Sequence, residues 1–246
     1  MEKRGQVTMF IIIGLILVVV VALLLYAQNK GFQAINIFGS RELTLKDEVS
    51  KCIIELGDPA LDLLARQGGS FNPKKFRLYL GYEVNYLCYN LEDTDVCSNR
   101  VLTQDDLELE LENYLGSKIK SCIDSRFGNL RSSNTQIQTG QYSLDVTVAR
   151  DNVLFLVKYP TTIRRSDSSN VINEYLEVVG KPLGRLYEVA YSIVRAESSI
   201  GDFDPVPYMI LYKDVQIRKD RPYPDKLYSI NKINDDYTFQ FAVEDE

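Results

Sequence analysis

Gln6–Ala27 reads QVTMFIIIGLILVVVVALLLYA and follows a short basic head, MEKRG. No charged side chain occurs between Gly5 and Asn29. At about 1.5 Å of rise per residue, the 21 residues from Val7 to Ala27 form a helix of about 31 Å, close to the hydrocarbon thickness of a bilayer. The stretch therefore predicts a transmembrane helix at residues 6–28 and makes the lipid bilayer the first expected partner.

The flanking charges predict the orientation of this helix. Lys3 and Arg4 lie directly before it, whereas the first basic residues after it, Lys30 and Arg41, are sparse. Because positive charge is retained on the cytoplasmic side, we expect residues 1–5 inside the cell and the rest of the chain outside. This predicts a single-pass protein of the cell membrane with a linker or stalk at residues 29–42 and an extracytoplasmic domain at 43–246, which we consider divisible near residue 130.

The composition of residues 30–246 argues against several function classes. Once Lys3 and Arg4 are set aside, 26 of the 28 basic residues remain, against 33 of the 34 acidic residues, a balance of −7. Such an acidic domain is not expected to bind nucleic acid. The chain also has no histidine, so it lacks the usual general base near neutral pH and the commonest metal ligand. We therefore expect no enzyme activity, no cofactor and no metal site.

The four cysteines, Cys52, Cys88, Cys97 and Cys122, predict disulfides. Their number is even, no C-x-x-C pair occurs, and no histidine is present to complete a zinc site. Cys52 and Cys122 each lie on the apolar stripe of an amphipathic helical pattern, which favours a bridge between two helices. Cys88 and Cys97 flank an acidic loop at residues 91–96, where a bridge could close a hairpin. Four cysteines allow three pairings; we favour Cys52 with Cys122 and Cys88 with Cys97.

Hydrophobic periodicity predicts an α+β domain of about three helices packed on antiparallel sheet. Helical spacing begins near Thr44, at Thr103 and at Pro182. Between residues 171 and 179 the pattern does not distinguish a strand from a helix. The expected strands are Phe76–Asn90 (one or two strands), Tyr142–Ala149, Val153–Tyr159, Tyr208–Tyr212, Lys226–Ile233 and Tyr237–Val243.

The N-terminus, KRGQVTMFIII, resembles the processing site of archaeal class III signal peptides, the pilin and archaellin type. The resemblance implies that Arg4 and Gly5 precede the cut, that Gln6 becomes the mature N-terminus, and that a prepilin-type peptidase acts there. It also implies self-association through the N-terminal helix. Pilins of this kind usually carry an acid at the fifth mature position, which is Phe10 here; an uncleaved signal-anchor is the alternative. The whole layout is similar to uncharacterised surface-anchored proteins of small archaea.

These observations predict a membrane-anchored structural or adhesive protein, a pilin-like or surface-assembly component without catalysis. The alternative is an anchored ligand-binding or accessory module of a larger membrane complex. Paired acids such as Glu108 and Glu112 lie one helical turn apart and are expected on a solvated face. Clustered tyrosines at residues 79–89 and 208–228 could form a binding surface, but we favour the interpretation that they belong to the core.

Overall fold

The structure is a computed structural model that describes residues 44–90, 97–131, 135–165 and 168–245. The predicted processing site at Arg4, Gly5 and Gln6, the predicted span at 6–28 and the acidic loop at 91–96 lie outside these residues. Within the described ranges, no helix has both the length and the apolar character needed to cross a membrane. The contacts divide the chain between Asp47 and Glu48, and Glu48–Glu246 forms one compact unit.

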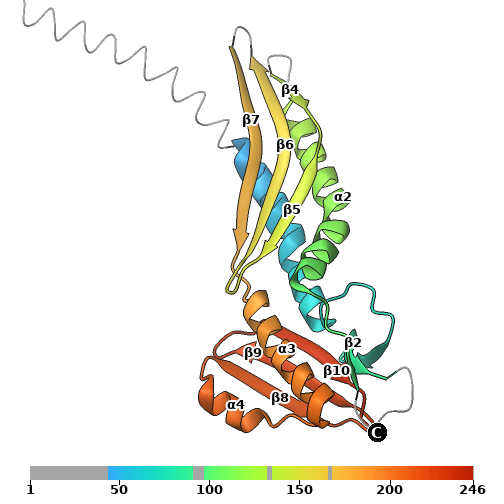
Figure 1. The fold of residues 1–246 in the computed structure, drawn as a ribbon. Helices are drawn as coiled ribbons and strands as arrows, with labels where there is room; N and C mark the ends of the chain where they lie inside the picture. The colour runs from blue at the N-terminus through green and yellow to red at the C-terminus, as the bar shows by residue number, and fades with distance from the viewer. Residues whose placement is uncertain (1–43, 91–96, 132–134, 166–167, 246) are drawn as a thin grey trace, which may run out of the picture. The chain divides into compact units, whose positions relative to one another are not determined.

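The domain is α+β, as the sequence predicted, with four helices in its described part (Figure 1). The first helix covers residues 44–66. The others are α2 (Gln104–Leu130), α3 (Leu183–Ile200) and α4 (Pro205–Leu211). Thr103 caps α2 through a reciprocal pair of hydrogen bonds, since its hydroxyl accepts from the Asp106 amide while the Asp106 carboxylate accepts from the Thr103 amide.

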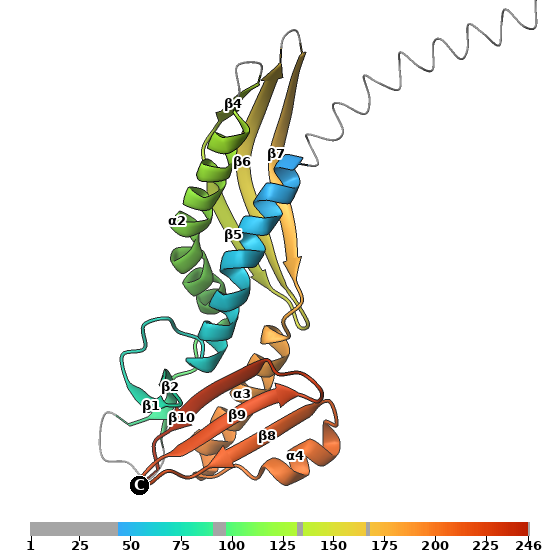
Figure 2. The ribbon, with the colours of Figure 1, turned by 180° about the vertical axis from the view of Figure 1, so that it is seen from behind.

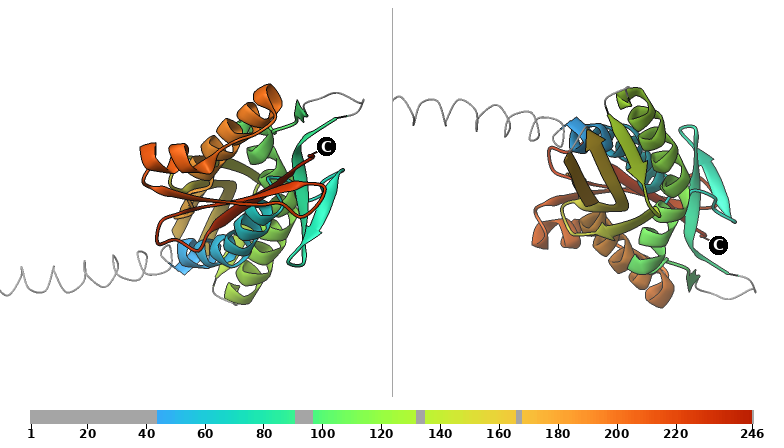
Figure 3. Two further views of the ribbon diagram at one scale, coloured as in Figure 1. Left: turned by 90° about the horizontal axis from the view of Figure 1, so that it is seen from below. Right: turned by 90° about the horizontal axis from the view of Figure 1, so that it is seen from above.

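A six-stranded sheet is built from both ends of the described chain, in the order β1-β2-β10-β9-β8 with β3 paired to β2. Its strands are β1 (Phe76–Tyr79), β2 (Tyr82–Tyr89), β3 (Ser98–Asn99), β8 (Val215–Asp220), β9 (Lys226–Lys232) and β10 (Thr238–Val243). All its pairings are antiparallel except that of β10 with β2, which is parallel. The α3 helix lies along one face of this sheet, and α4 lies beside β8 (Figures 1 and 3).

A four-stranded antiparallel sheet is formed by the middle of the chain: β4 (Gln136–Thr139), β5 (Ser143–Val148), β6 (Val153–Arg165) and β7 (Ser168–Val179). Both β4 and β5 pair with β6, and β7 pairs with β6 along almost its whole length. The helix at 44–66 and α2 cover the same face of this sheet (Figure 2). The ring of Phe155 lies on the first helix, where a Cβ built on Gly57 would be 3.4 Å from it.

Two sequence predictions are decided by this arrangement. Residues 171–179, which the periodicity left ambiguous, belong to strand β7. The prediction of a strand at Tyr208–Tyr212 is wrong, because Pro205–Leu211 is the short helix α4. Asp204 caps this helix, with its carboxylate accepting from the Val206 amide at 2.9 Å, and Pro205 occupies the first turn, where its missing N–H costs nothing.

Candidate functional site

Both predicted disulfides are present in the favoured pairing. Cys52 of the first helix is bonded to Cys122 of α2, and Cys88 of β2 is bonded to Cys97 just before β3. The Cys52 side chain is fully buried, so the first bridge lies inside the contact between the two helices. Stable disulfides are typical of secreted or extracellular domains, and this chemistry indicates an oxidising compartment.

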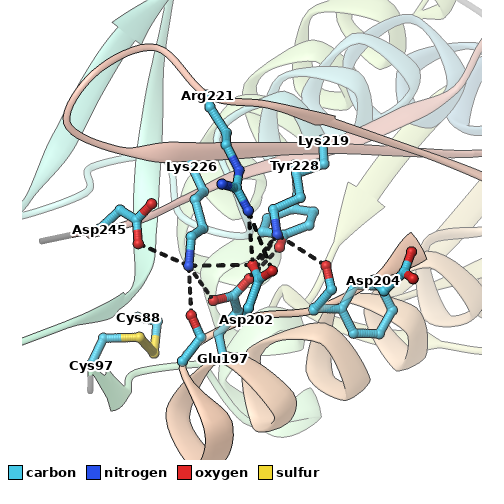
Figure 4. Close-up of polar contacts among 12 residues, drawn as sticks. Cys88, Cys97, Glu197, Asp202, Asp204, Lys219, Arg221, Lys226, Tyr228 and Asp245 are labelled. Carbon is cyan, nitrogen blue, oxygen red and sulfur yellow. Dashed lines mark hydrogen bonds and ion pairs between the residues drawn. A yellow bond between two sulfur atoms is a disulfide. The ribbon is translucent and has the colours of Figure 1, made fainter. Parts of the chain in front are cut away.

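A group of charged and polar side chains, partly buried, lies where α3 ends on the six-stranded sheet (Figure 4). We call it the α3 charge cluster; its side chains are Glu197, Asp202, Lys219, Lys226, Tyr228 and Asp245. Glu197, Lys226 and Tyr228 are 1%, 3% and 0% exposed. Glu197 belongs to the apolar stripe of α3, one turn after Ile193, and Lys226 and Tyr228 point to the same face of β9 because they are two residues apart.

Lys226 is the centre of this cluster. Its ammonium donates to Glu197 Oε2 at 3.0 Å and to the Gly201 carbonyl at 2.6 Å, and it forms an ion pair with Asp245 Oδ1 at 2.9 Å. Gly201 is the left-handed residue that ends α3, with φ of 78°. Lys226 therefore supplies a hydrogen-bond donor to the carbonyl group at the C-terminal end of α3. The helix dipole favours a positive charge at this end.

Tyr228 and Lys219 complete the cluster from neighbouring strands. The Tyr228 hydroxyl donates to Glu197 Oε1, and the Lys219 ammonium donates to Asp202 and, at 3.0 Å, to the Phe203 carbonyl. Lys219 faces Tyr228 across the β8–β9 pair. The resulting network joins the end of α3, two strands and the C-terminal segment through Asp245.

The pKa shifts of the cluster oppose acid–base catalysis near neutral pH. Burial, followed by the bond to Glu197, raises the pKa of Tyr228 far above its ordinary value. Burial by itself lowers the pKa of Lys226, but the bonds to Asp245 and Glu197 outweigh it and the pKa is raised. The phenol thus stays neutral and the amine stays charged around pH 7. Since every one of these groups is paired and the central three are buried, the cluster is suited to fixing the fold.

A second polar network lies at Asp225, which is 6% exposed. Its carboxylate accepts from Arg77 of β1 and, at 2.7 Å, from the Tyr86 hydroxyl of β2. Burial and the bond to Asp225 raise the pKa of Tyr86 to about 12. This network connects β1 and β2 to the turn between β8 and β9. Like the α3 charge cluster, it is suited to holding parts of the fold together.

The acids of α2 have a role that the sequence did not predict. Glu112 Oε1 accepts from the Val146 amide at 2.9 Å, and Glu108 Oε1 accepts from the Val148 amide at 2.8 Å. The prediction of a solvated face for Glu108 and Glu112 is therefore wrong. The outer edge of β5 needs acceptors for its amides, and these carboxylates supply them.

The tyrosines divide between the core and the surface. Tyr86 and Tyr228 are buried, as the core interpretation requires. Tyr212 and Tyr223 are exposed, and the Tyr208 ring packs on Tyr212 at a tilt, with ring centroids 4.6 Å apart. The tyrosines therefore do not gather into one exposed platform among the described residues.

The described part of the chain holds no group of three or more carboxylates or cysteines arranged to bind a metal ion. Compared with protein-family models, curated proteins and solved structures, the chain matches none of them.

A sequence signal for the α3 charge cluster does exist. Glu197 is an acid at a position where the stripe of α3 requires an apolar residue, and Lys226 begins a strand whose next four residues are buried. Charged residues at core positions are rare unless paired. The sequence contains both charged residues at positions of apolar pattern, but it does not show that Glu197 and Lys226 lie in contact.

Proposed function

We propose that the chain is a membrane-anchored extracytoplasmic structural or adhesive protein, a pilin-like component of a surface assembly. One observation carries the proposal: an uncharged apolar stretch long enough to span a bilayer, Val7–Ala27, precedes a domain that is closed by two disulfides. The positive head of the chain favours a cytoplasmic N-terminus and an external domain.

The construction of the domain supports a structural role. The charged groups of the α3 charge cluster are paired with one another, and its central pair, Glu197 and Lys226, is buried. The edge of β5 is closed by acids of α2, and the first helix is bonded covalently to α2. A rigid domain of this kind is suited to display at the end of an anchor.

The arrangement after the apolar stretch supports the pilin-like version. The first helix packs, around Gly57, on a strand of an antiparallel sheet. If the apolar stretch and this helix act together, the chain begins as pilins do, with an apolar helical segment that leads into a domain containing sheet. Self-association of the apolar helices would then hold the assembly together.

Mass spectrometry of the native N-terminus tests the processed version. We expect a mature chain that starts at Gln6, and we expect a Gly5→Val change to leave the chain starting at Met1, because the larger side chain blocks the position before the cut. A wild-type chain that also starts at Met1 would contradict processing.

Shearing of intact cells tests assembly separately. A filament component is released by shear and sediments as fibres, whereas an anchored accessory module stays with the membrane and partitions into detergent. Recovery of all the chain in the detergent phase would contradict the filament version while leaving the anchor intact.

A further inference from the structure

The outward face of α4 is apolar and exposed, and no other described element of the domain covers it. The helix reads PVPYMIL and has no charged residue, and none of its residues is buried. Val206, Ile210 and Leu211 are 57%, 69% and 73% exposed. A helix that is apolar on all sides is normally buried. We call Val206, Pro207, Ile210 and Leu211 the α4 patch.

The inward face of α4 is already used by its own sheet. The Met209 sulfur accepts from the Ile217 amide of β8 at 3.2 Å, and Tyr208 packs on Phe203 with ring centroids 5.7 Å apart. Helical spacing places Val206 and Ile210 on the opposite side, one turn apart. Because Tyr208 and Met209 occupy the side of α4 that faces the sheet, a second surface is needed to cover the α4 patch.

The charges at the ends of α4 are those that a second copy would need. Asp204 is exposed at the N-terminal end, where its carboxylate accepts from the Val206 amide. Lys213 is exposed just beyond the C-terminal end. In an antiparallel two-fold pair of α4 helices, Asp204 of each copy lies beside Lys213 of the other, and the helix dipoles also oppose each other favourably.

We propose that α4 is a homodimer contact in which the α4 patch of one chain packs against the same patch of a second copy. Four side chains on each copy bury much less than the roughly 800 Å² per partner of a standard interface. The contact is therefore weak in dilute solution. It is strengthened when both copies are held in one membrane, which raises their effective concentration; this last step rests on the proposed anchor.

Cysteine cross-linking of the full-length chain tests the contact. All four native cysteines are paired, so an Ile210→Cys change adds the only free thiol. A short bismaleimide should convert this variant to a covalent dimer in native membranes and, with lower yield, in detergent. The matched control is Leu176→Cys on β7, which is 60% exposed and should remain monomeric.

Charge variants test the pairing of the helix ends. In the Ile210→Cys background, Lys213→Glu should reduce the dimer yield several-fold by placing like charges together, whereas Lys213→Arg should retain it. Equal cross-linking at Ile210 and Leu176, or cross-linking of Ile210→Cys to a different protein or to none, would overturn the proposal. Detergent partition of the same samples reports on the anchor independently, so failure of the dimer and failure of the anchor give different results.

Discussion

At the scale of single residues, the domain depends on charges that are buried in pairs. Glu197 lies at the C-terminal end of α3, where the helix dipole disfavours an acid, yet it is almost fully buried. Lys226 and Tyr228 make this position acceptable because each gives it a hydrogen bond. Buried charges of this kind make the domain sensitive to substitution, because removing one partner takes a hydrogen bond away from the others in the interior.

A Glu197→Ala change should therefore destabilise the domain by about 1–3 kcal/mol, because the buried Tyr228 hydroxyl loses its acceptor while Lys226 keeps Asp245 and the Gly201 carbonyl. Chemical denaturation measured by circular dichroism checks this. Lys158→Ala is the control, because its ion pair with Asp145 is solvent-exposed on both sides and its loss should leave the midpoint unchanged. Equal midpoints for the Glu197 variant and the wild type would show that the cluster contributes nothing.

The same cluster predicts loss of stability in alkali. The pKa of Tyr228 is raised in the folded state, while an unfolded tyrosine ionises near pH 10. Its stabilising contribution is thus fully present below about pH 10 and is lost as the pH rises above it. Since Lys226 is shifted in the same direction, both groups favour unfolding in that range.

Tyrosinate absorbance and circular dichroism, recorded together during an alkaline titration, test this prediction. The buried phenols should ionise only as the ellipticity is lost, and the Tyr228→Phe variant should show one phenol fewer in that cooperative step. Ionisation of all 16 tyrosines near pH 10 without unfolding would refute it.

At the scale of elements, the sequence pattern predicted most helices and strands whose formation depends on residues close together in the chain. The six buried residues of α2 recur every four positions, from Leu107 to Phe127, and the Thr103 cap precedes them. The strands of the β5–β6 and β9–β10 hairpins were also expected, at residues 142–149, 153–159, 226–233 and 237–243. These elements are determined by neighbours in the sequence, so a single chain is enough to find them.

The pattern failed where distant segments decide the outcome. The run from Tyr208 to Tyr212 has the composition of a buried strand, but Asp204 and Pro205 begin a helix there and β8 occupies the sheet edge. The acids Glu108 and Glu112 gave no sign of their use, because their partners in β5 lie 40 and 34 residues away. The α3 charge cluster was missed for the same reason.

Two glycines in helices predict opposite effects of added bulk. In α3, a Cβ on Gly184 would lie 2.5 Å from the Ala149 carbonyl oxygen, because the helix docks on the β5–β6 turn there. Gly184→Ala should destabilise the domain by about 1–3 kcal/mol through overpacking. In α2, a Cβ on Gly116 would meet nothing within 4 Å, so Gly116→Ala should stabilise the domain by about 0.5–1 kcal/mol. Denaturation midpoints that move in the same direction for both variants would contradict this account of the docking.

At the scale of the whole molecule, the disulfide pairing was predictable and the sheet topology was not. Cys52 and Cys122 share the same place on two amphipathic patterns, so their pairing followed from the sequence. The six-stranded sheet joins β1 and β2 to strands that follow more than 120 residues later, including a parallel pair. Periodicity carries no information about which strands meet over such distances.

The two bridges should differ in their contribution to stability. In the chain-entropy account, closing the 70-residue separation of Cys52 and Cys122 stabilises by about 4 kcal/mol, against about 2.5 kcal/mol for the nine-residue separation of Cys88 and Cys97. Paired cysteine-to-alanine variants of each bridge, compared by thermal denaturation, test this order. A larger loss from removing the short bridge would contradict it.

The central claim is that an apolar N-terminal stretch holds this disulfide-bonded domain outside the cell membrane. Protease added to intact cells tests it most directly, followed by analysis of the membrane fraction with an antibody against the domain. The account predicts that the full-length chain is membrane-bound before treatment and loses the domain after it, while a cytoplasmic marker stays intact. A chain that is protected until the cells are lysed, or that is found in the soluble fraction, would contradict it.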